Sequence, residues 1–177
     1  LPWRLQEPKP PWPAGRQGYL QLPASGHPGN AADPPCIGLL WGSGRYLDGH
    51  GRERDYRRKS VLGADLQVLL QGLAQRPLQL WNLQVGPDRE QGDAANVPWA
   101  GALAPDADFL GLAQCLQQLD LLICVDTAAA HLAGAMGLEA WVLLPWAAAS
   151  RWQRHSSTTL WYPSLRLWRQ PRHGDWL

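Results

Sequence analysis

The residues best suited to chemistry lie where an apolar segment ends in an acid and a helix-favouring segment begins. Leu121–Val125 is apolar, Asp126 and Thr127 follow it, and three alanines lead on to His131. The first N–H groups of a helix have no partner within the helix, and the helix dipole favours negative charge at that end. We therefore expect Thr127, Ala128 and the following backbone N–H groups to hold a phosphate or diphosphate, with His131 as an additional donor.

A purely structural interpretation of the same residues is equally open. Asp126 or Thr127 can cap the helix, since both residue types are favoured at that position. The alanines favour helix because of their high helix propensity. His131 is then an ordinary polar residue. Thr127 and His131 are four residues apart, about one helical turn, so they share a helix face in either interpretation.

A second candidate, Gly42-Ser43-Gly44, follows the apolar run Cys36–Trp41. In the dinucleotide-binding motif GxGxxG a third glycine would occupy the position of Leu47, and a helix would open where this chain has a charged loop. The sequence therefore disfavours an NAD-dependent oxidoreductase. Ser43 and its neighbouring N–H groups are expected to face a phosphate, and a plain turn at the end of a strand is the alternative.

Two other segments carry polar groups that can meet a nucleotide. In Arg57-Arg58-Lys59-Ser60, Lys59 is suited to a diphosphate, although such a run is by default a solvated charge cluster unless its loop opens at the same sheet edge. Gln84 can bond a base or ribose, and Gly86 permits a close approach of the ligand. The alternative for Gln84 and Gly86 is a simple exit from a strand.

Apolar runs and helical spacings alternate along the chain. Strands are expected at 36–41, 78–83, 121–125, 140–144 and 165–169, and helices at 62–75, 109–119 and 127–136. This alternation predicts an α/β fold, a Rossmann-like parallel sheet with helices on both faces. Residues 42–58, 84–98 and 126–131 would form polar loops that converge at the carboxyl ends of the strands. Residues 1–35, rich in Pro and Gly, are expected to be a linker or strap preceding a domain over 36–177.

Composition narrows the class of protein. The net charge is +1 over 177 residues, which gives no general case for binding nucleic acid. The three cysteines indicate a reducing, cytoplasmic environment, and no apolar run reaches the roughly 20 residues of a membrane span. No metal-ligand spacing of Cys and His occurs. Asp106-Ala107-Asp108 has the spacing of a metal-binding pair but precedes a helix, where a cap is expected.

Taken in order, these segments resemble the C-terminal half of a GT-B glycosyltransferase. The similarity is to the heptosyltransferase-like group, and specifically to bacterial proteins in which such a domain follows tetratricopeptide repeats. The most specific part is LDLLICVDTAAAHLAGAMG, residues 119–137. The other matching parts are IGLLW, Arg58-Lys59-Ser60, Asn82-Leu83-Gln84, WVLLP at 141–145 and WYPSLRLWRQ at 161–170.

The resemblance implies a nucleoside-diphosphate sugar as the ligand. Because a helix start and Lys59 would stabilise the diphosphate, and no Asp-x-Asp pair ends a strand, we expect transfer without a metal or another cofactor. The resemblance also implies that Lys59, Thr127, Ala128 and His131 lie at the diphosphate, and that Asp126 matches the acid that ends the strand. Together with the residue types, this places Ser43 at the diphosphate as well, and Gln84, Gly86 and Asp126 at the nucleoside or sugar. The resemblance assigns no catalytic residue to this half, because acceptor and base come mainly from an N-terminal half. The alternative function is a non-catalytic nucleotide-binding or protein-interaction module with the same fold.

Overall fold

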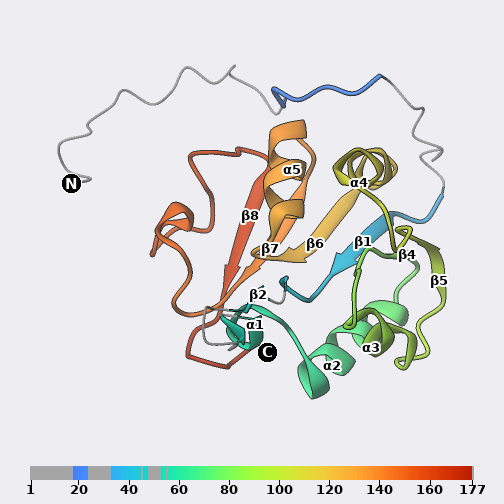
Figure 1. Cartoon of the computed structure of the whole chain (residues 1–177), viewed down its shortest axis with the longest axis horizontal. Helices are drawn as coiled ribbons and strands as arrows, with labels where there is room; N and C mark the ends of the chain where they lie inside the picture. Colours follow the sequence, from blue (N-terminus) through green and yellow to red (C-terminus); the bar gives the residue numbers. More distant parts are fainter. Residues whose placement is uncertain (1–17, 24–32, 45, 48–52, 55, 177) are drawn as a thin grey trace.

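The computed structural model describes residues 18–23, 33–44, 46–47, 53–54 and 56–176. Its centre is a parallel sheet of six strands in the order β5-β4-β1-β6-β7-β8 (Figure 1). The strands are β1 Cys36–Leu40, β4 Gln79–Asn82, β5 Trp99–Ala102, β6 Leu121–Val125, β7 Ala140–Leu144 and β8 Leu165–Arg169. The predicted α/β class and parallel sheet are confirmed.

Helices cover both faces of the sheet, also as predicted. They are α1 Tyr56–Lys59, α2 Gly63–Ala74, α3 Arg89–Asp93, α4 Phe109–Leu116 and α5 Ala128–Met136, with a short 3-10 turn at Ser150–Trp152. Buried residues of α4 and α5 belong to one apolar cluster, and those of α2 to a second. In β6, Leu122 and Cys124 join the first cluster while Ile123 and Val125 join the second, as the alternation of side chains along a strand requires.

Helix ends follow local chemistry. Asp108 accepts a hydrogen bond from the Gly111 N–H at 2.8 Å, so the acid pair at 106–108 supplies a helix cap, as expected. Helix α5 ends at Gly137, whose φ of 74° is left-handed and favours glycine.

Two segments differ from the expectation. The predicted loop 42–58 contains a two-stranded hairpin, β2 Tyr46–Leu47 with β3 Glu53–Arg54, and most of α1. Residues 84–98 include α3, and the unpredicted strand β5 follows directly at the sheet edge beside β4.

The part of 1–35 that the structure describes includes a segment lying on the end of α5. The Leu20 N–H donates to the Ala135 carbonyl at 2.9 Å. A Cβ at Gly18 would lie 2.0 Å from the Met136 backbone, so the two segments touch there. The rest of the predicted strap, residues 1–17 and 24–32, lies outside the described residues, and the boundary at 35/36 stays a prediction.

Candidate functional site

The strand order reverses direction between β1 and β6. From β1 the chain builds outward through β4 and β5, whereas from β6 it builds the opposite way through β7 and β8. In open parallel sheets, ligands bind in the crevice outside the carboxyl ends of the strands at such a switch point. The segments that leave β1 and β6 here are Gly42–Ser43 and Asp126–Thr127, both singled out from the sequence.

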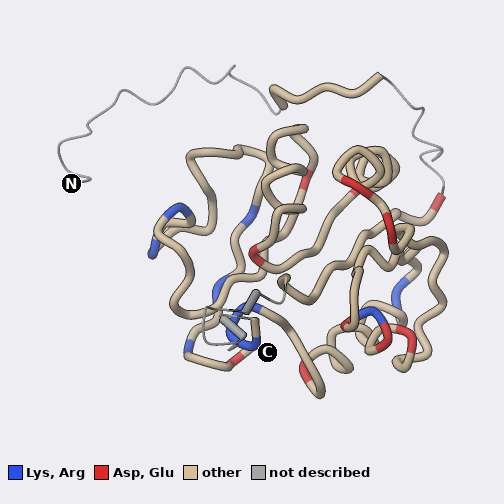
Figure 2. Tube along the Cα trace, viewed as in Figure 1, with Lys and Arg blue, Asp and Glu red and all other residues tan. Residues whose placement is uncertain are grey.

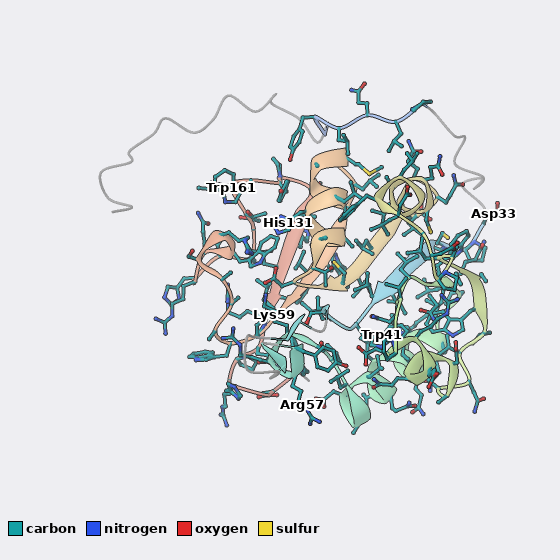
Figure 3. All side chains as sticks on the ribbon, viewed as in Figure 1. Asp33, Trp41, Arg57, Lys59, His131 and Trp161 are labelled. Atoms are coloured by element: carbon teal, nitrogen blue, oxygen red, sulfur yellow. The ribbon has the colours of Figure 1, made fainter. Side chains whose placement is uncertain are left out.

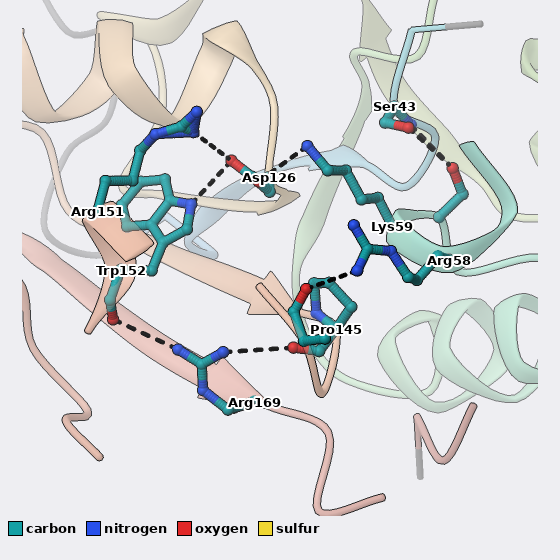
Figure 4. A network of polar contacts seen from close by, with 10 residues as sticks. Ser43, Arg58, Lys59, Asp126, Pro145, Arg151, Trp152 and Arg169 are labelled. Atoms are coloured by element: carbon teal, nitrogen blue, oxygen red, sulfur yellow. Dashed lines mark hydrogen bonds and ion pairs between the residues drawn. The ribbon is translucent and has the colours of Figure 1, made fainter. Parts of the chain in front are cut away.

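Asp126 is the most heavily engaged residue at this edge. Its carboxylate is 3 % exposed, and its Oδ2 lies 3.1 Å from Lys59 Nζ (Figure 4). This contact is an ion pair without an aligned hydrogen bond, since Oδ2 has no hydrogen-bond partner among the described residues. Oδ1 accepts a 2.8 Å hydrogen bond from Trp152 Nε1, and Arg151 lies 3.9 Å away. Asp126 therefore organises the surrounding cations and the turn.

Lys59 and Arg58 reach this edge from α1. Besides the pairing of Lys59 with Asp126, Arg58 donates to the Ala147 carbonyl at 2.9 Å, just beyond β7. The basic run at 57–60 is therefore more than a solvated charge cluster, because it lies at the sheet edge that holds Asp126. Figure 2 shows the blue residues of α1 close to the C-terminal end of the chain, and Arg57 and Arg58 line a small cavity with His173 there.

The start of α5 lacks a side-chain cap. Thr127 occupies the cap position with extended backbone, yet its side chain forms no capping hydrogen bond. Its Oγ1 is buried and has no hydrogen-bond partner within the described part of the chain. Ala128 is exposed, whereas Ala129 is buried. The hydroxyl and the first N–H groups of α5 are therefore available to an added acceptor.

His131 is carried by α5 (Figure 3) and lies between the aromatic rings of Trp152 and Tyr162. It stacks on Trp152 with a centroid distance of 5.0 Å, and its Nδ1 is 3.1 Å from the Tyr162 hydroxyl. Burial lowers the pKa of His131 from 6.5, the Arg151 charge lowers it further, and Asp126 partly opposes them. The imidazole is therefore neutral at pH 7, so any role it has toward an anion is that of a neutral donor.

Of the remaining predicted residues at this edge, Ser43 and Gln84 are hydrogen-bonded within the protein, whereas Gly86 is exposed. Ser43 is buried: its N–H donates to Ser60 Oγ at 3.0 Å, and the two hydroxyl oxygens are 3.5 Å apart. Gln84 Oε1 accepts from the Gly42 N–H at 2.7 Å, and its Nε2 donates to the Val85 carbonyl at 2.9 Å. Gly86 has a left-handed φ of 72°, and a Cβ added there would meet nothing within 4 Å.

Sequence reasoning did not select Arg151, Trp152 or Tyr162 for the site. Arg151 and Trp152 contact Asp126, while Trp152 and Tyr162 enclose His131. Arg151 and Trp152 follow β7, so the rule that ligand loops follow parallel strands was the signal that could have found them. Tyr162 lies in the aromatic–proline turn before β8, within the segment 161–170, and the sequence favoured a packing role for this turn over a place at the rim of the pocket.

Metal ligands are not gathered here. Within the described ranges, no group of three or more His, Cys, Asp or Glu side chains could hold a metal ion. No described helix is both long and apolar enough to cross a membrane.

No protein-family model matches the chain, and no curated protein matches it in sequence. Among solved structures, E. coli heptosyltransferase WaaC with ADP is similar, with a TM-score of 0.53 and 15% sequence identity. The fold is similar to that of a GT-B glycosyltransferase domain. The match covers 82% of this chain but 42% of that one, so the chain spans less than half the length of the heptosyltransferase. At this identity the similarity shows the fold alone.

Proposed function

We propose that the chain is the donor-binding domain of a glycosyltransferase, which holds the diphosphate of a nucleotide sugar at the start of α5. The observation that carries the proposal is Thr127 Oγ1, a buried hydroxyl without a partner among the described residues, at an uncapped helix start. A buried polar atom in this state needs an explanation, and a phosphate oxygen accepting from it supplies one. The N–H groups of Ala128 and Ala129 would donate hydrogen bonds to the same anion.

Lys59 would supply the positive charge. An ammonium has three donors, and its contact with Asp126 uses one side of it. Asp126 keeps the lysine at the switch point before the ligand arrives, and Arg151 adds a second cation beside it. The buried acid is thus a positioning group for the cations rather than a direct contact of the phosphate.

Gln84 would hydrogen-bond the nucleoside of the ligand. Its two hydrogen bonds fix the turn at Gly42 and still leave one amide hydrogen and one lone pair for a ribose or base. Gly86, with open space around it, would let the nucleoside approach the backbone.

The chemistry that such a site supports is stabilisation of a leaving group. When the sugar departs, negative charge grows on the nucleoside diphosphate, and donors that are already oriented stabilise it without reorganisation. The heptosyltransferase-like fold, and the ADP named with the similar WaaC structure, agree with this proposal.

Binding of ADP, UDP and GDP by calorimetry tests the proposal. At least one is expected to bind, with Thr127→Val weakening it about tenfold, the effect of losing one hydrogen bond to a charged group. Lys59→Met is expected to weaken binding at least as much, while Arg76→Met, at an exposed position just after α2, leaves it unchanged. Failure of all three nucleotides to bind, or equal binding by the Thr127 and Lys59 variants, contradicts the proposal.

Two further measurements test whether binding needs a metal and whether the domain takes part in glycosyl transfer. Because cationic side chains and helix N–H groups would carry the charge stabilisation, EDTA is expected to leave nucleotide affinity unchanged. A large loss of affinity on chelation contradicts metal-independent binding. Nucleotide binding by a chain that supports no transfer, even when joined to an acceptor-binding half, favours the non-catalytic module instead.

A further inference from the structure

A second cavity lies beside the segment that follows β7. Its volume is about 480 Å³, within the range of small-ligand sites. It is lined by Trp146, the segment 147–150, Gln153, Arg154 and Arg169. None of these lining residues was assigned to the nucleotide, so this cavity requires its own explanation.

Two arginines give the cavity its charge. Arg169 is half-buried, and burial together with the neighbouring Arg154 lowers the pKa of its guanidinium. No ion pair joins Arg154 or Arg169 to a carboxylate in the described part of the chain. A partly desolvated cation beside a like charge, with no acid opposite, favours a bound anion.

Arg169 also holds the cavity wall in shape. Its guanidinium donates to the Gln153 carbonyl at 2.7 Å and makes longer contacts, at 3.4 Å, with the carbonyls of Pro145 and Trp152 (Figure 4). These bonds fix Gln153, whose φ of 48° is left-handed and unfavourable for a residue with a side chain. The cation is therefore oriented in advance, while Arg154 has no hydrogen-bond partner among the described residues and is exposed.

Trp146 supplies an apolar wall. Its side chain is 45% exposed although its backbone N–H is fixed by Gln170 Oε1 at 3.1 Å. An exposed indole on a fixed backbone offers a flat face to the C–H groups of a sugar ring. Ser150 and Gln153 add hydroxyl and amide groups for sugar hydroxyls.

We propose that this cavity binds a carbohydrate bearing a carboxylate or phosphate group, with the anion between Arg154 and Arg169 and the sugar ring against Trp146. This second ligand goes beyond the proposed nucleotide. The two sites share Trp152: its indole donates to Asp126, while its main-chain carbonyl contacts Arg169.

The two indole groups allow the sites to be observed separately by NMR of the whole ¹⁵N-labelled chain. Glucuronate is expected to shift the Trp146 indole N–H signal, and glucose, its neutral counterpart, to leave it in place. ADP is expected to shift the Trp152 signal instead, because that indole bonds Asp126. Trp146→Phe and Trp152→Phe assign the two signals. If glucuronate binds and ADP does not, this proposal stands while the nucleotide proposal fails.

Arg154→Gln is the deciding variant, since the exposed Arg154 has no described bond whose loss would disturb the fold. It is expected to weaken glucuronate binding about tenfold and to leave ADP affinity unchanged. Arg76→Gln, a matched change of an exposed arginine just after α2, is expected to alter neither affinity. Comparing glucose 6-phosphate with glucuronate shows whether the site prefers a phosphate or a carboxylate. Comparing glucose 6-phosphate with inorganic phosphate measures the contribution of the sugar ring. The proposal is overturned if glucose binds as tightly as glucuronate, or if Arg154→Gln leaves glucuronate binding unchanged. It is also overturned if neither acidic sugar binds, or if phosphate binds as tightly as glucose 6-phosphate.

Discussion

Trp152 connects two of the residues singled out from the sequence. It is fully buried, donates to Asp126 through its indole nitrogen, and stacks on His131 through its ring. Trp152→Phe keeps an aromatic ring but removes the donor and some volume. We expect a loss of about 2–4 kcal/mol in the free energy of unfolding, measured in urea, because a buried carboxylate loses a hydrogen bond. Trp161→Phe, at a half-exposed position, is the control and is expected to change little.

His131 makes stability depend on pH. Its pKa in the folded protein lies below the ordinary 6.5, so the unfolded chain takes up a proton first as the pH falls. The folded state therefore loses stability as the pH falls from about 6.5 through the lowered pKa of His131, and this loss is absent above that range. Comparing urea unfolding at neutral and mildly acidic pH, we expect a shallower pH dependence for His131→Gln than for the natural chain. Identical slopes contradict this assignment.

The positions of the candidate site residues could be predicted from the sequence better than their hydrogen-bond partners could. Asp126 and Thr127 lie at the end of β6 as expected, because a buried strand followed by a small-residue helix leaves a local pattern. The bonds between Gln84 and Gly42, and between His131 and Tyr162, join residues far apart in the sequence. No local spacing encodes such pairs, so the internal engagement of Gln84 could not be anticipated.

At the level of elements, close packing of α5 depends on a small residue. A Cβ on Gly134 would lie 2.3 Å from the Tyr162 ring, whereas Gly72 on α2 has nothing within 4 Å. Gly134→Ala is expected to destabilise the protein by about 1–3 kcal/mol through overpacking. Gly72→Ala is expected to stabilise it by about 0.5–1 kcal/mol, because alanine favours helix. Thermal unfolding of both variants measures the contrast, and changes of the same sign would contradict it.

The elements that escaped prediction are those whose stability comes from neighbours. Strand β5 reads Trp-Ala-Gly-Ala, without the β-branched residues that mark a strand, and it is defined by its pairing with β4. Helix α1 is a four-residue charged turn with no apolar period. By contrast, β1, β6 and β7 are continuous apolar runs and were predicted almost to the residue.

At the scale of the whole molecule, the strand order brings the segments of the candidate site to one edge of the sheet. Because β1 and β6 are neighbours, the segments 42–43 and 126–127 leave the same edge of the sheet, although more than half of the described domain lies between them in the sequence. The convergence was predictable from parallel strands alone, while the order of the outer strands was not, since no local feature fixes which edge a strand joins.

Removing the residues before Asp33 tests what the segment 18–23 contributes to the domain. Starting the chain at Asp33 keeps the Pro35 carbonyl that accepts from Gln79, and removes the contact of Leu20 with Ala135 and the hydrogen bond of Tyr19 with Tyr162. We expect a folded domain that is about 1 kcal/mol less stable per lost hydrogen bond. Nucleotide affinity should be retained, because the Lys59–Asp126 pair and the start of α5 lie within the shorter chain. Circular dichroism and calorimetry measure the two effects. Loss of nucleotide binding in a folded shortened chain would mean that residues before Asp33 shape the site through Tyr162 and His131.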